Sequence, residues 1–164
     1  MKAVILVGGE GTRLRPLTSN LPKPMIPLVN RPFLEHVLEY LKSYGITDVI
    51  LSMCYRPDVI EGHFGNGAGF GVNLTYVVEE KPLGTAGGVK NVEQNLDGTS
   101  YIFNGDILTD LDLSAMLEYH RAKGAKATIS LTPVEDPTAY GLVETEAEGA
   151  VIGFIEKPTW DRVT

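Results

Sequence analysis

Features that mark several other classes of protein are missing from this chain of 164 residues. It has one cysteine, Cys54, which excludes an intrachain disulfide and a cysteine metal cluster. Its histidines, His36, His63 and His120, match no metal-ligand spacing. Basic residues are in the minority, with 14 Lys and Arg against 21 Asp and Glu, and the net charge of −7 argues against nucleic acid or an acidic membrane as a partner.

Long hydrophobic runs are also absent. No apolar stretch approaches the length that a membrane span requires. The N-terminal run Ala3–Val7 follows a single lysine and stops at Gly8, so it is too short for the apolar core of a secretory signal. We therefore expect a protein of a reducing cytoplasm without a membrane partner. A hydrophobic content of 43% is enough for one globular domain with its own core.

The most informative stretch that is present is Gly8–Met25, which reads GGEGTRLRPLTSNLPKPM. It directly follows the short, β-branched apolar run, which predicts a buried first strand. Glycines let a backbone approach a ligand closely and turn its N–H groups inward. Arg13, Arg15 and Lys23 add positive charge to an acidic protein, and Glu10 is the only acid among them. This pattern predicts a cradle for a polyanion such as the phosphate tail of a nucleotide.

Two common phosphate-binding loops do not fit this stretch. The spacing of a P-loop does not occur in it, and a dinucleotide fingerprint would need a third glycine where Leu14 stands. Pro16, Pro22, Pro24 and Pro27 exclude a long helix directly after the glycines. The plain structural alternative is a strand-to-loop turn that carries surface arginines.

Strand-like and helix-like patterns alternate along the chain. This alternation predicts an α/β fold of three layers, with helices on both faces of a mostly parallel, Rossmann-like sheet. A glycine-rich segment at 65–71 is a connector rather than a second phosphate loop, because no helix pattern follows it. The predicted strands are 1–7, 48–53, 72–78, 101–103 and 127–133, with shorter runs at 141–144 and 151–155, and the predicted helices are 33–45, 57–64 and 113–123.

Polar residues follow two of the predicted buried strands. Ligands of open α/β sheets bind at the carboxyl ends of the strands, where Glu79, Glu80 and Asp106 would stand. Asp106 could make a turn, or it could bind a metal ion that triphosphate oxygens also hold, since Mg²⁺ takes only one or two protein carboxylates. Asp110 and Asp112 are better explained as capping and first-turn acids of the helix that follows.

The pattern Gly-Gly-x-Gly-Thr-Arg-Leu-x-Pro-Leu-Thr followed by Pro-Lys-Pro-Met resembles the signature of the sugar-1-phosphate nucleotidyltransferases. These enzymes join a nucleoside triphosphate to a sugar 1-phosphate and release pyrophosphate. The resemblance extends from Met1 to about Pro158. The run Leu83–Gly87 resembles the nucleoside-binding segment of the family, Asn104-Gly105-Asp106 resembles its metal-ligand segment, and Tyr140-Gly141 and Glu156-Lys157-Pro158 resemble its sugar-binding segments.

The resemblance implies the nucleotide-diphospho-sugar transferase type of fold, Mg²⁺ as the cofactor with Asp106 as its ligand, and a nucleoside triphosphate and a sugar 1-phosphate as the bound partners. The oligomeric state stays open, with a homo-oligomer as one alternative. By the resemblance, the catalytic residues are Arg13, Lys23, Asp106 and Lys157, the nucleotide-binding residues are Gly8, Gly9, Gly11, Thr12, Arg13, Lys23, Glu79, Glu80, Gly84 and Thr85, and the sugar-binding residues are Gly141, Glu156 and Lys157.

The adjacent glutamates Glu79 and Glu80 suggest which base is bound. Guanine presents N1–H and N2–H₂ side by side, and one ionised carboxylate can accept both. Thymine and uracil instead present one N3–H between carbonyl oxygens, which a carboxylate would repel. Glu79 and Glu80, with Glu80 the weaker choice, therefore favour GTP, and the resemblance to mannose-1-phosphate guanylyltransferases adds mannose 1-phosphate as the acceptor. The plain alternative is that both glutamates are solvated charges at the end of a strand.

Several alternatives to this function stay open. One is a glucose-1-phosphate thymidylyl- or uridylyltransferase, and another is a cytidylyl- or molybdopterin-type transferase on the same sheet. A third is a non-catalytic regulatory homologue that binds nucleotide sugar. The family also has a second metal-binding aspartate beyond Glu-Lys-Pro, and no such segment occurs here. From this we expect residues 1–164 to form a catalytic domain that is truncated at its C-terminus.

Overall fold

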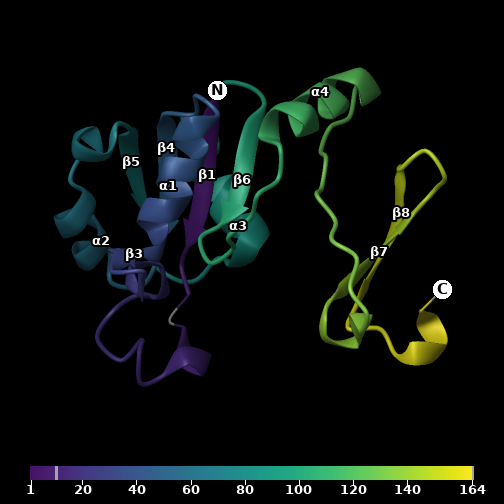
Figure 1. The fold of residues 1–164 in the computed structure, drawn as a ribbon, viewed down its shortest axis with the longest axis horizontal. Coiled ribbons are helices and arrows are strands. Elements are labelled where there is room, and N and C mark those ends of the chain that lie inside the picture. Colours follow the sequence, from purple (N-terminus) through teal and green to yellow (C-terminus); the bar gives the residue numbers. More distant parts are fainter. Residues whose placement is uncertain (10, 164) are drawn as a thin grey trace. The chain divides into compact units, whose positions relative to one another are not determined.

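The computed structural model describes residues 1–9 and 11–163, so residue 10 of the predicted cradle and residue 164 lie outside the described part of the chain. The chain falls into two compact units, residues 1–111 and 112–164, each with its own secondary structure (Figure 1). The glycine-rich stretch, both candidate glutamates and Asp106 belong to the first unit. Gly141, Glu156 and Lys157 belong to the second.

A four-stranded parallel sheet forms the centre of the first unit. Its central strand β1 (Lys2–Val7) is buried because Ala3, Val4 and Ile5 are shielded on both faces. Parallel neighbours need long crossovers, and three helices supply them: α1 (Phe33–Ser43), α2 (Pro57–Phe64) and α3 (Gly84–Asn91). The predicted α/β fold with a mostly parallel sheet is confirmed. In spatial order the strands are β5 (Asn73–Val78), β4 (Asp48–Met53), β1 (Lys2–Val7) and β6 (Ser100–Asn104).

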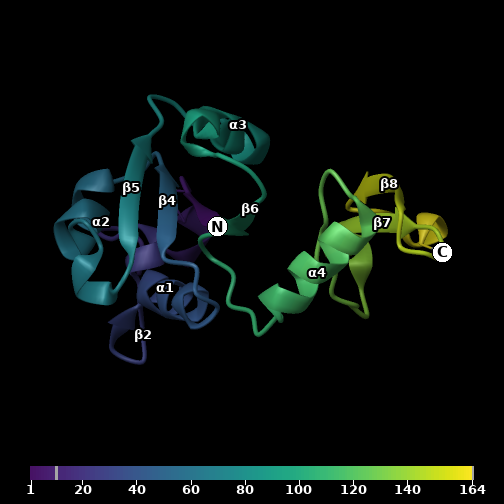
Figure 2. The same cartoon turned by 90° about the horizontal axis from the view of Figure 1, so that it is seen from above.

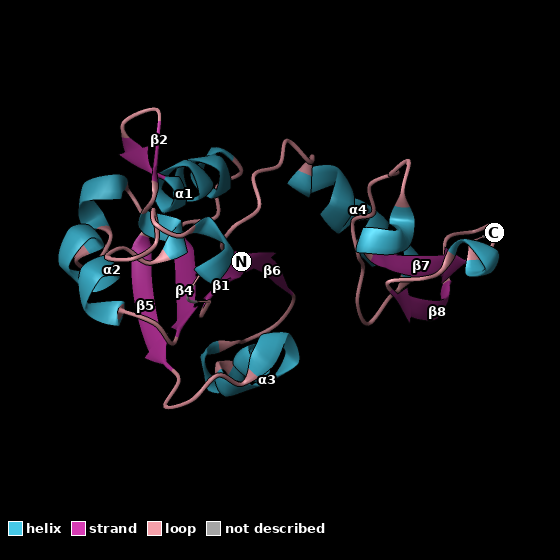
Figure 3. Ribbon diagram, turned by 90° about the horizontal axis from the view of Figure 1, so that it is seen from below, coloured by secondary structure: helices cyan, strands magenta, loops and turns pink. Residues whose placement is uncertain are grey.

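Helices cover both faces of this sheet, as Figures 2 and 3 show for α1 (Phe33–Ser43) on one side and α3 (Gly84–Asn91) on the other. Helix α1 buries an apolar stripe at helical spacing and ends where Gly45 adopts a φ of 72°. The prediction of helices at 33–45 and 57–64 is confirmed, the second as α2 (Pro57–Phe64). The buried stripe of α1 consists of Leu34, Val37, Leu38 and Leu41.

The proline-rich segment after the glycines forms short pieces. Two 3₁₀ turns, Thr12–Leu14 and Lys23–Met25, precede a small hairpin of β2 (Pro27–Leu28) and β3 (Arg31–Pro32). The prolines thus prevent a long helix here, as predicted. Further 3₁₀ turns are Ala68–Phe70, within the predicted connector, and Glu93–Asn95.

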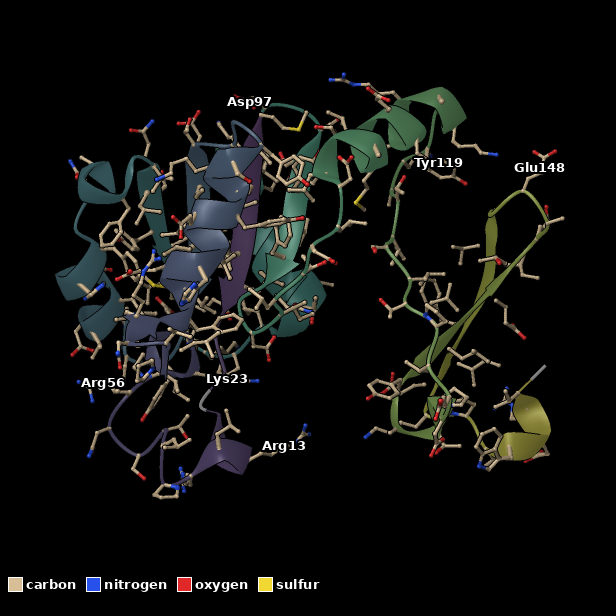
Figure 4. The ribbon with its side chains drawn as sticks, in the orientation of Figure 1. Arg13, Lys23, Arg56, Asp97, Tyr119 and Glu148 are labelled. Carbon is tan, nitrogen blue, oxygen red and sulfur yellow. The ribbon has the colours of Figure 1, made fainter. Side chains whose placement is uncertain are left out.

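In its described residues, 112–163, the second unit contains one α-helix and one antiparallel hairpin. Helix α4 (Leu113–Lys123) begins at Asp112, whose carboxylate accepts a 3.0 Å hydrogen bond from the Ala115 N–H, so the predicted cap is confirmed. Strands β7 (Gly141–Thr145) and β8 (Val151–Glu156) form the hairpin. At the turn of the hairpin, the Glu148 carbonyl accepts hydrogen bonds from the hydroxyl of Tyr119 at 3.3 Å and from Lys123 Nζ at 3.0 Å. Tyr119 and Glu148 are labelled in Figure 4. Short 3₁₀ turns at Pro137–Ala139 and Trp160–Arg162 flank the hairpin.

The prediction of a fifth strand at 127–133 is wrong. These residues are all described, and none of them belongs to a strand. Their sequence alternates apolar and polar residues, but a strand also needs a partner whose backbone groups complete its hydrogen bonds. In residues 112–163 the described pairing is that of β7 with β8. Ile129 and Leu131, the apolar residues of the alternation, are accordingly about half exposed.

Candidate functional site

A cavity of about 400 Å³ lies in the first unit, at the carboxyl ends of its strands. The strand registers pair Val7 with Met53, Met53 with Val78, and Leu6 with Asn104, so the segments that follow all four strands begin at one edge of the sheet. Residues distant in the sequence therefore meet there. Of the predicted site residues, Gly8, Gly9, Lys23, Glu79, Gly84, Thr85 and Asp106 line the cavity.

An ion pair joins two of these residues. Lys23 Nζ lies 2.6 Å from Oδ2 of Asp106, and their side chains are 36% and 42% exposed. Asp106 is placed by Gly105, whose N–H donates a 2.8 Å hydrogen bond to the carbonyl of Leu6. A Cβ on Gly105 would lie 2.9 Å from that same carbonyl oxygen and would overlap Cγ1 of Val7. Glycine is therefore required at this position to bring the aspartate to the edge of the sheet.

The glycine-rich loop folds back on itself through Thr18, a residue that the sequence interpretation missed. Thr18 is 2% exposed, and its hydroxyl donates a 2.8 Å hydrogen bond to the carbonyl of Gly11. Gly11 has a φ of 63°, and a Cβ on it would lie 2.9 Å from Thr18 Cγ2 and 3.3 Å from Lys23 Cβ. This close packing holds the segment that returns Lys23 to the cavity.

Four predicted nucleotide-binding residues do not line the cavity. Gly11 directly precedes the 3₁₀ turn that contains Thr12 and Arg13, and Arg13 is exposed there (Figure 4). Glu80 is exposed on the loop after β5. The structure therefore brings Lys23 to the cavity without Arg13, and Glu79 without Glu80.

Glu79 is held by two donors. Its Oε1 accepts a 2.9 Å hydrogen bond from the hydroxyl of Ser52, and its Oε2 accepts a 3.0 Å hydrogen bond from the N–H of Leu83. Ser52 also lines the cavity and was not predicted. The signal for it in the sequence is a hydroxyl within an otherwise apolar buried strand, because such a group needs a hydrogen-bond partner.

Helix α3 begins at the cavity. Gly84, at its first position, has a φ of 72°, and Gly84 and Thr85 both line the cavity. The first N–H groups of a helix have no partner within it and carry partial positive charge. No acidic residue lies in the first turn of α3 to neutralise that charge. This end of the cavity therefore favours a polar or anionic group.

The predicted sugar-binding residues meet in the second unit. Gly141 and Glu156 are direct partners across the β7–β8 ladder, and a Cβ on Gly141 would lie 3.4 Å from Oε2 of Glu156. The N–H of Lys157 donates a 2.9 Å hydrogen bond to the carbonyl of Tyr140. Lys157 has a φ of 46°, which a residue with a side chain rarely adopts. Two short motifs that carried little information separately thus form one end of a hairpin.

Asp106 fits a magnesium ion that draws most of its ligands from phosphate and water. Within residues 1–9 and 11–163, no group of three or more His, Cys, Asp or Glu side chains is arranged to hold a metal by itself. Mg²⁺ commonly uses one or two carboxylates together with substrate phosphates, which a single Asp106 beside the predicted phosphate cradle could satisfy. The histidines have other neighbours: His36 Nε2 lies 2.9 Å from the Leu28 carbonyl, and His63 Nε2 lies 2.8 Å from Oε1 of Glu35.

None of the helices in the described residues has the length and apolar composition that are needed to cross a bilayer.

Residues 2–163 match the family model described as Nucleotidyl transferase. The chain is 49% identical to a mannose-1-phosphate guanylyltransferase of Mycobacterium tuberculosis over 94% of its own length, and 42% identical to a mannose-1-phosphate guanyltransferase of Debaryomyces hansenii over 96% of it. It spans 44% and 45% of the length of these two relatives.

Two solved structures are similar to this chain. A putative glucose-1-phosphate thymidylyltransferase from Bacillus anthracis, in complex with a sucrose, superposes with a TM-score of 0.86 at 29% identity, over 96% of this chain and 65% of that one. HddC from Yersinia pseudotuberculosis, complexed with GMP-PN, superposes with a TM-score of 0.79 at 30% identity, over 96% and 70%. The family suggested by the glycine-rich signature is confirmed, and the chain belongs to the nucleotidyl transferase family.

Proposed function

We propose that this protein transfers a nucleotidyl group from a nucleoside triphosphate to a hexose 1-phosphate and releases pyrophosphate. The observation that carries the proposal is the cavity in which Gly8 and Gly9, the Lys23–Asp106 pair and the first residues of α3 meet. Backbone N–H groups, a lysine and a helix N-terminus are all groups that bind phosphate. Membership of the nucleotidyl transferase family supports the same reaction.

In this reaction an oxygen of the sugar 1-phosphate attacks the α-phosphorus of the triphosphate. The new O–Pα bond forms while the bond from Pα to the bridging oxygen of the β-phosphate breaks, and that oxygen leaves with both electrons as part of pyrophosphate. No covalent intermediate with the protein is needed. The protein contributes positioning and stabilisation of negative charge.

We assign each candidate residue a role in this reaction. Lys23 would neutralise the α-phosphate, and Asp106 would hold Mg²⁺, which supplies charge neutralisation on the phosphate oxygens when it is bound. Arg13 and the N–H groups of the glycine-rich loop would stabilise the departing pyrophosphate. In the second unit, the sugar phosphate would be bound by Lys157 and the sugar hydroxyls by Gly141 and Glu156.

We further propose GTP as the nucleotide and mannose 1-phosphate as the acceptor. Glu79 lines the cavity as a carboxylate whose two oxygens each accept one hydrogen bond from the protein. An ionised carboxylate has about four acceptor sites, so it could still accept from guanine N1–H and N2–H₂. The relatives named mannose-1-phosphate guanylyltransferase and the structure complexed with GMP-PN support this choice.

A thymidylyltransferase is the second candidate, because the B. anthracis protein that superposes so well bears that name. The test is a pyrophosphate-release screen of GTP, dTTP, UTP, ATP and CTP against several hexose 1-phosphates. We expect the highest turnover with GTP and mannose 1-phosphate. A preference for dTTP or UTP would remove the guanine assignment and keep the reaction. A protein that binds GDP-mannose and turns over none of the pairs would instead be a regulatory homologue.

A further inference from the structure

Ser52 is a buried hydroxyl whose nearest neighbours along β4 are apolar. It is 1% exposed, and the residues around it in β4 are Val49, Ile50, Leu51 and Met53. A hydroxyl placed in such surroundings weakens the fold unless it is hydrogen-bonded. Its one proton goes to Oε1 of Glu79 at 2.9 Å, since its other acceptor, the carbonyl of Gly88, lies at 3.5 Å, which is long for such a bond.

The same carboxylate connects β4 to the loop before α3. While Oε1 of Glu79 accepts from Ser52, Oε2 accepts from the N–H of Leu83 at 3.0 Å. Leu83 directly precedes Gly84 and Thr85, which line the cavity. Hydrogen bonds to an ionised carboxylate are stronger than those between neutral groups. Glu79 therefore fixes the course of the chain where it enters the cavity.

Helix α3 approaches this carboxylate closely because Gly88 has no side chain. A Cβ on Gly88 would lie 2.9 Å from Oε1 of Glu79, 3.2 Å from Cδ2 of Leu6 and 3.4 Å from Oγ of Ser52. The backbone of Gly88 does not have the left-handed φ that would call for glycine, so close packing accounts for the residue. We call the set of Ser52 Oγ, the Glu79 carboxylate and the N–H of Leu83, packed against Gly88, the Glu79 clamp.

We propose that Ser52 is a positioning residue for the choice of nucleobase. This inference rests on the proposed function. Through the Glu79 clamp, Ser52 fixes the direction in which the free acceptor sites of the carboxylate face the cavity. Most of the proposed phosphate site lies outside the clamp, because Gly8, Gly9 and Lys23 follow β1, whereas the clamp joins β4 to the loop before α3. Loss of the hydroxyl therefore lowers base discrimination more than it lowers the affinity for the phosphate tail.

The first test measures binding of GTP, dTTP and tripolyphosphate to Ser52→Ala by titration calorimetry, without any sugar 1-phosphate. The matched control is Ser43→Ala, which removes an exposed hydroxyl that donates to the carbonyl of Tyr40. We expect the ratio of GTP affinity to dTTP affinity to fall about tenfold in Ser52→Ala alone, the scale of one charge-assisted hydrogen bond. Tripolyphosphate affinity stays at the wild-type value in Ser43→Ala, and in Ser52→Ala it falls by less than the ratio of GTP affinity to dTTP affinity does. A wild-type ratio in Ser52→Ala overturns the proposal.

A second arm separates positioning from a general effect on the fold. If Ser52 acts through Glu79, then Ser52→Ala added to Glu79→Ala causes no further loss of base discrimination. An equal loss in both backgrounds assigns Ser52 a purely structural role and overturns the proposal. Gly88→Ala provides an independent variant that keeps the serine hydroxyl. Its methyl group would lie 2.9 Å from Oε1 of Glu79 and would displace the carboxylate, so the variant should reduce the same ratio.

The third arm does not depend on the reaction. In ¹⁵N-labelled protein without nucleotide, Ser52→Ala should increase hydrogen exchange at the N–H of Leu83 several-fold, because the carboxylate that accepts from it is less constrained. Unchanged exchange at Leu83 overturns the clamp. If wild-type protein binds none of the nucleotides, the proposed function fails, and with it the role in base choice, whereas this exchange measurement still decides whether the clamp exists.

Discussion

Lys23 Nζ lies 2.6 Å from Oδ2 of Asp106, although 83 positions separate the two residues in the sequence. The proposed cation for the α-phosphate and the proposed ligand for Mg²⁺ therefore neutralise each other in the protein without substrate. A divalent ion that approaches Asp106 has to compete with the lysine. A triphosphate gives the lysine an alternative partner and brings phosphate oxygens to the metal at the same time.

We therefore expect Lys23→Met to bind Mn²⁺ more tightly than wild-type protein does when no nucleotide is present. The affinity should rise about tenfold, because two unit charges near a protein surface interact by a few kcal/mol before solvent and salt reduce the effect. Mn²⁺ binding is followed by electron paramagnetic resonance of the free ion. Lys90→Met, which removes an exposed lysine paired with Glu93, serves as the control.

Asp106→Asn should abolish the gain when it is combined with Lys23→Met. Equal Mn²⁺ affinity in wild-type protein and Lys23→Met would mean that the ion pair does not compete with the metal. GTP affinity of Lys23→Met should fall in the same preparation, since the lysine is then missing from the phosphate site.

Catalysis should depend more on Lys23 than on Arg13. Lys23→Ala should lower kcat/KM by about two to four orders of magnitude, the scale for removing one preorganised charge. Arg13→Ala should cost less, about tenfold, because Arg13 is exposed on its 3₁₀ turn and does not line the cavity. Arg121→Ala, on the exposed surface of α4, controls for the loss of a positive charge. A larger loss for Arg13 than for Lys23 would show that the loop closes over the triphosphate during turnover.

The sequence predicted the sheet of the first unit and its helices α1 and α2 because their signals are local. The stripe of α1 and the apolar runs of β1 and β4 each determine one element without reference to the rest of the chain. Residues 127–133 carry the same alternation, but the pairing of a strand depends on a distant partner that the segment itself does not encode. That is why this one prediction failed.

Of the residues that line the cavity, the sequence pointed to those whose residue type indicates a chemistry, such as Lys23, Glu79 and Asp106. The residues that hold them were missed. Thr18 and Ser52 are small hydroxyl side chains whose importance comes from being buried, at 2% and 1% exposure, beside a carbonyl and a carboxylate. Neither burial nor the partner can be read from a single position in a sequence.

Gly105 gives a prediction about the fold that underlies the site. Gly105→Ala places a methyl group against Cγ1 of Val7 and 2.9 Å from the carbonyl oxygen of Leu6, so the variant should lose about 1–3 kcal/mol of unfolding free energy. Gly62→Ala is the matched control, because a Cβ there meets no atom within 4 Å and lies inside α2. It should gain about 0.5–1 kcal/mol, since alanine favours a helix over glycine. Urea unfolding of both variants measures the difference, and a stable Gly105→Ala protein would show that the loop before Asp106 adapts freely.

The last prediction concerns Glu35, which links three elements of the first unit away from the cavity. Its carboxylate is 12% exposed, accepts a 2.9 Å hydrogen bond from Arg31 Nε, and lies 2.8 Å from His63 Nε2. Burial by itself raises the pKa of Glu35, but the hydrogen bonds from Arg31 and His63 outweigh it and hold that pKa below the ordinary value of 4.5. A carboxyl whose pKa is lowered on folding stabilises the protein above its unfolded pKa, and this stabilisation is lost as the pH falls through the folded pKa.

Glu35→Gln should therefore lower the unfolding free energy by about 1–2 kcal/mol at pH 7, the scale for hydrogen bonds to a charged group that is mostly shielded. The difference from wild-type protein should shrink as the pH falls below about 4.5, where the wild-type carboxyl becomes protonated. Glu39→Gln is the control, since Glu39 accepts from the same Arg31 at 3.0 Å but is 58% exposed, so its replacement should cost less than about 0.5 kcal/mol. Urea unfolding at several pH values between 3 and 8 measures both variants. If Glu35→Gln and Glu39→Gln lost equal stability with the same pH profile, the shielding of Glu35 between Arg31 and His63 would have no energetic consequence.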